Sequence, residues 1–93
     1  MGILGKFTKQ PVEVQDYDID FREYLTSQAD TAVSHTVVAE AGVTIMASNL
    51  TAGVVKVFVA GGTDGNQYKV SATITTTGGR VKQGDIVVRV KEF

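Results

Sequence analysis

Apolar and polar residues alternate along much of the chain, most regularly over residues 54–77. Two runs in this stretch place every second residue on an apolar face, whose members are Val55, Val57, Val59, Tyr68, Val70, Ala72 and Ile74. A period of two is typical of a half-buried β-strand. Between the runs, residues 61–66 (GGTDGN) favour a turn, because glycine tolerates positive φ and Asp and Asn hydrogen-bond their own backbone. The pattern predicts an antiparallel β-hairpin that needs further strands to cover its apolar face.

Shorter alternating runs predict those further strands, at residues 12–19, 30–41, 43–50 and 81–91. Residues expected to share a face within one run are Val12 with Val14; Val33, His35, Val37 and Ala39; Val43, Ile45 and Ala47; and Ile86, Val88 and Val90. The pair Gly84-Asp85 predicts a bulge or a break in the last strand.

Phe21, Tyr24 and Leu25 have helical spacing over a single turn, so one short helical turn is predicted near residues 20–25. The remainder amounts to about seven short strands, with turn signals every ~8–12 residues. This pattern is typical of an all-β, immunoglobulin-like or fibronectin-like antiparallel β-sandwich. Tyr68 stands where such folds keep a tyrosine corner. The same strands would also fit a small β-barrel.

Pro11 is the only proline of the chain. Proline is tolerated at the first residue of a strand or on an edge strand. We therefore expect residues 11–93 to form a single β-sandwich domain and residues 1–10 to form a flexible N-terminal arm. Phe7, with Ile3 and Leu4, would anchor this arm if it became ordered on a partner.

Composition excludes several classes of protein. The chain has 93 residues and a formal net charge of −1, with acidic and basic residues mixed along it. Nucleic-acid binding would need a clustered basic face, and a membrane span would need about 20 consecutive apolar residues. Neither is present in the sequence. Because there is no cysteine, there is no disulfide framework and no thiolate metal site.

Asp16, Asp18 and Asp20 are the most site-like group of side chains. Alternation puts them on one side of an extended segment, ~6.6 Å apart. Calcium needs roughly six to eight oxygen ligands at about 2.3–2.6 Å, so these three carboxylates are only a weak candidate for a metal site. Like charges in this pattern more often keep an edge strand solvated.

Catalytic chemistry finds little support in the sequence. His35 is the only histidine, and no serine near it lies in a nucleophile motif. Residues 61–65 would need a following helix to act as a phosphate loop, but a strand pattern follows them. We therefore predict no enzyme activity and no cofactor.

Val54, Phe58 and Val87 fall on the faces opposite the predicted core, where a sheet with one solvated side should be polar. A lone exposed apolar residue needs no explanation, whereas a cluster marks a protein–protein surface. Together with Phe7, these residues are the candidates for a protein interface.

Two sets of positions stand out together. The first set comprises Asp16-Tyr17, Asp20-Phe21, Leu25, Asp30-Thr31 and Val33. The second comprises Gly61-Gly62-Thr63, Gly65, Tyr68-x-Val70, Ile74-Thr75-Thr76 and Gly79-Arg80. In these positions, over nearly the whole domain, the chain resembles a known family of small phage and prophage virion proteins of the fiber–tail adaptor type.

The resemblance implies an immunoglobulin-like virion component that is made in the host bacterial cytoplasm and works by docking other virion proteins. It implies tail or fibre subunits as partners and no catalytic residues, and it leaves self-association on assembly open. The alternative is an immunoglobulin-like cell-surface module, such as an adhesin or a carbohydrate-binding domain. That module would require a secretion signal or a larger parent chain.

Overall fold

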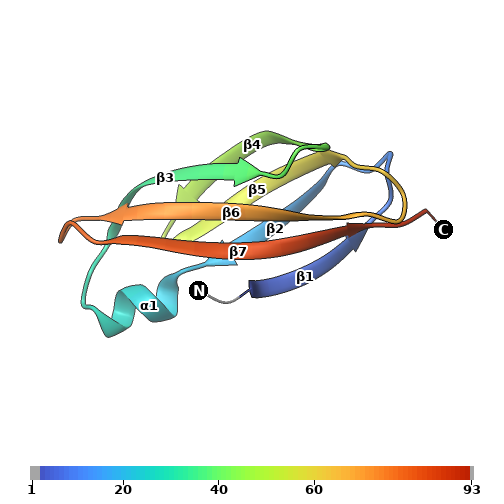
Figure 1. Ribbon diagram of the computed structural model, residues 1–93. Coiled ribbons are helices and arrows are strands. Elements are labelled where there is room, and N and C mark those ends of the chain that lie inside the picture. Colours follow the sequence, from blue (N-terminus) through green and yellow to red (C-terminus); the bar gives the residue numbers. More distant parts are fainter. Residues whose placement is uncertain (1–2, 93) are drawn as a thin grey trace.

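The computed structural model of the chain describes residues 3–92, with side chains from residue 5 onward. These residues form seven strands and one short helix (Figure 1). In chain order the elements are β1 (Ile3–Lys9), β2 (Gln15–Asp20), α1 (Arg22–Ser27), β3 (Ala32–Ala39), β4 (Val43–Thr51), β5 (Val54–Gly61), β6 (Gln67–Thr76) and β7 (Val81–Val90). The predicted helical turn is therefore confirmed, shifted by two residues toward the C-terminus.

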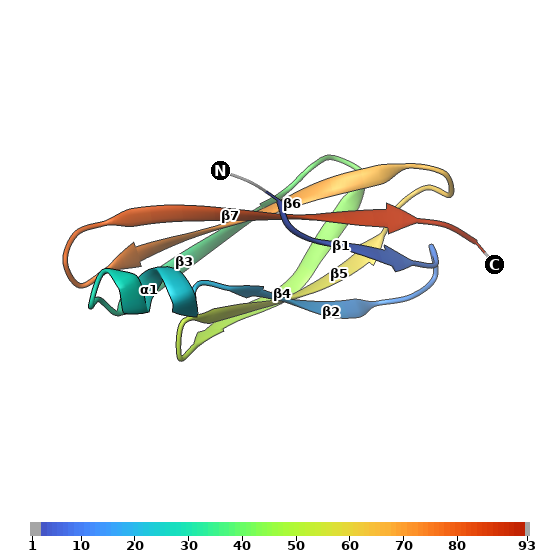
Figure 2. The same ribbon diagram turned by 90° about the horizontal axis from the view of Figure 1, so that it is seen from below.

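The strands form two sheets, with the orders β1-β7-β6-β3 and β2-β5-β4. Figure 2 shows the two layers stacked, with α1 at one end. This is the predicted all-β sandwich. Its order matches the immunoglobulin pattern, with β2, β5 and β4 as strands B, E and D and β7, β6 and β3 as strands G, F and C. Strand β1 belongs to the sheet of β7, β6 and β3, where it pairs in parallel with β7. All other strand pairs are antiparallel.

The core lies between the sheets and consists mainly of β-branched residues of β5, β6 and β7. Its fully or almost fully buried members include Val55, Val57, Val59, Val70, Ala72, Ile74, Ile86 and Val88. Burying each of the larger side chains contributes about 1.5–3 kcal/mol. The alternating residues singled out in the sequence are therefore the ones that hold the sheets together.

The two most regular strands, β5 and β6, do not pair with each other. β5 pairs with β2 and β4, and β6 pairs with β3 and β7. The predicted hairpin is thus wrong, because residues 62–66 carry the chain from one sheet to the other. Alternation indicates which face of a strand is buried. It does not indicate which sheet the strand belongs to, because the strands of both sheets turn an alternating apolar face to the core.

A tyrosine corner fixes this crossing. The Tyr68 hydroxyl accepts a hydrogen bond of 2.9 Å from the Thr63 backbone N–H. Hydrogen bonding with the Thr63 side chain, and then with its backbone, lowers the pKa of Tyr68. The Tyr68 ring packs against Gly42, where an added Cβ would lie 2.6 Å from a ring carbon. Gly42 also has a φ of 114°, so a side chain there would be strained as well as crowded. The corner expected from the position of Tyr68 is confirmed.

Residues 3–9 of the expected flexible arm form β1, with Phe7, Thr8 and Lys9 paired with Val88, Arg89 and Val90. The Phe7 ring lies 4.7 Å from the Tyr17 ring, centroid to centroid, and packs against the core. One half-buried aromatic residue, rather than a long alternating run, packs this strand against the domain. Met1 and Gly2 of the arm and Phe93 of the expected domain lie outside the described residues.

Two bulges change the faces predicted from strict alternation. In β4 the register shifts between Ile45 and Ala47, so that Ala47 lies opposite Phe58 and faces outward. In β3 a shift between Ala32 and Ser34 leaves Val33 60% exposed. A bulge adds one residue to its strand, so residues that strict alternation would place on one face lie on opposite faces before and after the bulge.

Other expectations near strand ends also differ from the structure. β2 begins only at Gln15, so Val12 and Val14 lie in a connecting turn and are 88% and 55% exposed. β7 runs without a break through Gly84, which pairs with Ala72 in regular register. Both residues of that pair are small and buried, which explains a glycine at this position without a bulge.

Candidate functional site

The outer face of the β2-β5-β4 sheet has an apolar centre. Phe58 on the middle strand is half-buried, and its direct cross-strand neighbours are Asp16 and Ala47. Met46, in the β4 bulge beside it, is 60% exposed. Val54 is half-buried further along β5. We call Met46, Ala47, Val54 and Phe58 the Phe58 face; an aromatic side chain at its centre is unusual for the solvated side of a sheet.

Charged side chains border the Phe58 face. The Lys56 Nζ lies 3.1 Å from Asp16 Oδ2 and 3.1 Å from Asp18 Oδ1. The Asp20 carboxylate binds Arg22 through both oxygens, at 2.7–3.0 Å. The hydrogen bond from Lys56 lowers the pKa of Asp16, and the one from Arg22 lowers that of Asp20.

These pairs bear on the metal candidate. Asp16 and Asp18 share the Lys56 ammonium group, whereas Asp20 binds Arg22, so the three carboxylates do not meet around one point. In the part of the chain that the structure describes, no three His, Cys, Asp or Glu side chains are grouped to hold an ion. The three carboxylates form an acidic row on β2, along one side of the apolar centre.

The structure separates the other two interface candidates from this face. Phe7 is half-buried between the sheets, against Tyr17. Val87 is only 9% exposed on the outer face of the other sheet, where Lys6 and Lys69 pair with it from both sides. Aliphatic stems of lysine cover apolar neighbours in this way. Of the four candidates, Val54 and Phe58 remain accessible together.

His35 lies at the margin of the core and faces β4. Its Nε2 is 3.0 Å from the Ser48 Oγ, a contact that joins the edge strands of the two sheets. A serine–histidine pair can act as nucleophile and base only with a third group to orient the ring. No described side chain hydrogen-bonds the other ring nitrogen, so the pair has a structural explanation.

The glycine-rich stretch at residues 61–65 is a structural connection, followed by β6 and not by a helix. The Gly65 backbone N–H donates to the Val90 carbonyl oxygen at 2.9 Å. Asp64 Oδ1 accepts a hydrogen bond from the Glu92 backbone N–H at 2.8 Å. The loop is thus fastened to the chain that follows β7 and does not offer these groups to a phosphate.

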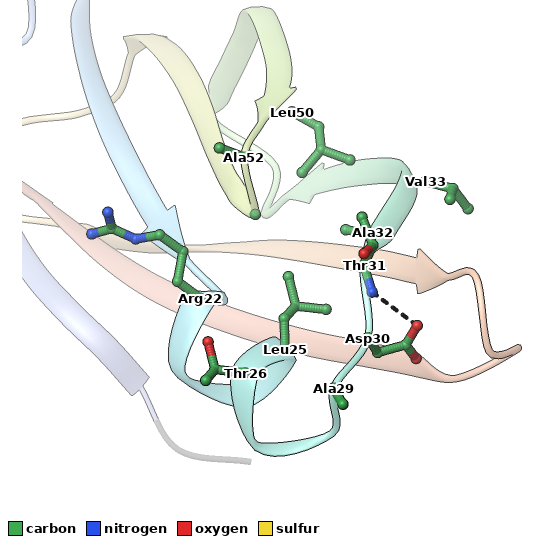
Figure 3. Close-up of a pocket in the computed structure, with 11 residues that line it drawn as sticks. Arg22, Leu25, Thr26, Ala29, Asp30, Thr31, Ala32, Val33, Leu50 and Ala52 are labelled. Atoms are coloured by element: carbon green, nitrogen blue, oxygen red, sulfur yellow. Dashed lines mark hydrogen bonds between the residues drawn. The ribbon is translucent and has the colours of Figure 1, made fainter.

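A hollow of about 680 Å³ lies beside α1 at one end of the sandwich (Figure 3). It is lined by α1, the loop to β3 and the β4–β5 turn, and Leu25 and Leu50 point toward each other across it. Sequence reasoning did not find it, because two separate stretches of the chain, residues 22–33 and 50–53, form its wall. Val33 was no signal either, because alternation placed it on the core face, whereas the bulge in β3 leaves it 60% exposed.

Asp30 anchors the wall of this hollow, and its side chain is only 5% exposed. Its Oδ1 accepts hydrogen bonds from the backbone N–H groups of Thr31 at 2.8 Å and Gly78 at 3.1 Å, and its Oδ2 accepts one from Arg80 Nη1 at 2.9 Å. A hydrogen bond with the Thr76 side chain, together with these contacts, holds the pKa of Asp30 well below its usual range. The carboxylate therefore ties the β6–β7 turn to the loop before β3.

This low pKa predicts a pH-dependent contribution of Asp30 to stability. A carboxylate whose pKa is lower in the folded state stabilises the fold above the unfolded-state pKa of about 4, and loses this contribution as pH falls through the folded pKa. Asp30→Asn should lower the urea midpoint at pH 7, and its difference from the unchanged chain should shrink steadily below pH ~4. Urea unfolding between pH 2 and 7 measures this. Glu23→Gln, which changes an exposed carboxylate on α1, is the control; a difference for Asp30→Asn that does not vary with pH would contradict the assignment.

Comparison with known proteins places this fold in context. A family model described as podophage GP4 fiber-tail adaptor protein gp77 matches residues 9–89. The chain belongs to this family. No curated protein matches it. Within residues 3–92, no helix is long and apolar enough to cross a membrane.

The fiber-tail adaptor family gives the chain a structural role in the phage tail, as a component of the virion that binds other virion proteins. The match begins at Lys9 and ends at Arg89, so it covers β2, α1, the strands β3 to β6 and nearly all of β7. Only β1 lies almost entirely before it. The resemblance noted in the sequence is thus confirmed for the family.

Proposed function

We propose that this adaptor works without catalysis, by docking tail and fibre subunits through its Phe58 face. The observation that carries the proposal is a half-buried aromatic residue at the centre of a sheet face that otherwise faces solvent. Aromatic residues and methionine are enriched in the buried centres of protein interfaces, and polar residues form their rims. The partner that fits is a protein surface with an apolar centre and basic residues around it, which would meet Asp16, Asp18 and Asp20.

A small interface of this kind gains strength from repetition. A few apolar side chains on one sheet bury less area than a stable two-protein complex requires. In a virion, several copies bind to one symmetrical assembly, and each bound copy raises the effective concentration of the next. The rim charges would then govern orientation and choice of partner more than affinity.

Two features support a role without catalysis. The family is a structural one, and His35, the only histidine of the chain, is engaged with Ser48 between the sheets. We further propose that the chain is made in the cytoplasm of the host bacterium and becomes part of the virion on assembly.

Deletion of the coding sequence tests this function. Particles assembled without the chain should contain tail proteins but lack fibres, because the connection between the two is missing. Mass spectrometry of purified particles measures both, and expression of the chain from a plasmid should restore the fibres. Particles that retain a normal fibre content after the deletion would contradict the proposed function.

A further inference from the structure

The strand β1 is held to the domain by few apolar contacts. Within residues 5–9, the only fully buried side chain is that of Lys9, and Phe7 is half-buried. No described side chain of β1 belongs to the cluster of fully buried apolar residues between the sheets; Phe7 only packs against this cluster. Because β1 is the last strand of its sheet, it pairs on one side alone. The strand therefore adds backbone pairing and one aromatic ring, but little buried apolar surface.

The burial of Lys9 opposes the docking of β1. Its Nζ donates to the carbonyl oxygens of Gln10 at 2.8 Å and Glu13 at 2.9 Å, which are neutral groups. Burial lowers the pKa of Lys9, and the charge of the Glu13 carboxylate offsets this effect only in part. A buried ammonium group without a full counter-charge retains part of its desolvation cost. When β1 leaves its place, this group returns to water.

A second polar group lies buried between β1 and β2. Tyr17 is on the inner side of β2 and is 8% exposed, with the Phe7 ring 4.7 Å from its own ring, centroid to centroid. Its hydroxyl group is buried and has no hydrogen-bond partner among the described residues. A buried polar group without a partner lowers the stability of the state that buries it. Removal of β1 would uncover Tyr17 and give the hydroxyl group water as a partner.

We propose that β1 is a releasable strand, which leaves β7 as a unit while the other strands and α1 stay folded. Docking of β1 gains the pairing with β7 and the contact between Phe7 and Tyr17, but it buries the Lys9 ammonium group and the Tyr17 hydroxyl group. The core residues of β5, β6 and β7 pack against one another without any side chain of β1 among them. Proteins open in such cooperative units at free energies below that of global unfolding.

Release of β1 changes one edge of the molecule and leaves the rest in place. Figure 2 shows β1 beside β7, with β2 in the other layer. Without β1, a row of backbone N–H and C=O groups along β7 becomes free. The Phe58 face keeps its shape, because β4 and β5 carry it on the other sheet. β1 is thus an element whose position assembly can change without disturbing the Phe58 face.

Two neighbouring backbone amides after the core of β7 distinguish release of β1 from global unfolding. The Lys91 N–H donates to the Lys9 carbonyl oxygen at 2.9 Å, whereas the Val90 N–H donates to the Asn66 carbonyl oxygen at 2.8 Å. Release breaks the first bond and leaves the second. In hydrogen exchange of the full chain followed by NMR, Lys91 and the amides of β1 that bind β7 should share one protection factor, at least about a hundredfold below that of Val90. Equal protection of Lys91 and Val90 would overturn the proposal.

Substitutions test whether the opening uncovers Tyr17. Tyr17→Phe removes the unpaired hydroxyl group and should slow exchange at Lys91 at least about fivefold, whereas Phe7→Ala should speed it at least about tenfold. Tyr24→Phe is the matched control, because Tyr24, on α1, has no such buried unpaired hydroxyl group; the rate at Lys91 should stay the same. An unchanged rate at Lys91 in Tyr17→Phe would overturn the proposal, since the opening would then leave Tyr17 covered.

These measurements use the isolated chain. Their results are therefore independent of whether the Phe58 face docks fibres.

Discussion

Removal of residues 1–9 is expected to take away about a third or more of the stability of the domain. The deletion exposes Tyr17 by removing the Phe7 ring, and it uncovers the edge of β7. Burial of an aromatic side chain contributes about 1.5–3 kcal/mol, and each backbone hydrogen bond lost between β1 and β7 contributes about 0.5–1.5 kcal/mol. A domain of this size has a total free energy of unfolding of ~5–14 kcal/mol.

Urea unfolding followed by circular dichroism measures the effect. If the shortened chain does not fold, Phe7→Ala in the full chain tests the same contact, with an expected loss of about 1.5–3 kcal/mol. Thr8→Ala is the matched control, because Thr8 is exposed on the other face of β1, and it should change stability by less than about 0.5 kcal/mol. An unchanged urea midpoint after the deletion would show that residues 3–9 are the flexible arm first predicted from the sequence.

The alternation of apolar and polar residues identified the core, because a strand with one buried face needs an apolar residue at every second position. Val57, Ile74 and Val88 lie inward where a period of two places them. The turn residues Ala52 and Gly53 have φ values of 50° and 82°, which fit the tight two-residue connection between β4 and β5. These features depend on a few neighbouring residues, so a single sequence contains the information.

Pairing between strands could not be predicted in the same way. Strands β5 and β6 follow each other in the sequence and have the same pattern, yet they belong to different sheets. Whether the chain turns back beside itself or crosses to the opposite layer depends on contacts such as the one between Tyr68 and Thr63. The parallel pairing of β1 with β7 depends likewise on residues more than seventy positions apart.

The candidate site was predictable only in part. Phe58 could be recognised because it lies, with Val54 and Lys56, on the side of β5 opposite the alternating core residues, where polar side chains are expected. Met46 could not, since only the bulge brings it beside the face. The turn before β2 was hidden for another reason: Val12 and Val14 fit the alternation of a strand, and only hydrogen bonds from Lys9 show that they belong to a turn.

Phe58→Ser is expected to remove the centre of the docking surface while the domain stays folded. Truncating a central aromatic residue of an interface costs about 2 kcal/mol or more, which is about a 30-fold loss of affinity. The core is unaffected, because the Phe58 side chain lies on the outer face between Asp16 and Ala47. Val38→Ser is the matched control: Val38 is 68% exposed on the outer face of the other sheet, opposite Ser71.

The fibre content of purified particles tests this account most directly. A phage that lacks the coding sequence is supplied with the unchanged chain, with Phe58→Ser or with Val38→Ser, and fibres per particle are counted by electron microscopy. We predict full fibre content with the unchanged chain and with Val38→Ser, and few or no fibres with Phe58→Ser. Equal fibre content with all three chains would contradict docking through the Phe58 face.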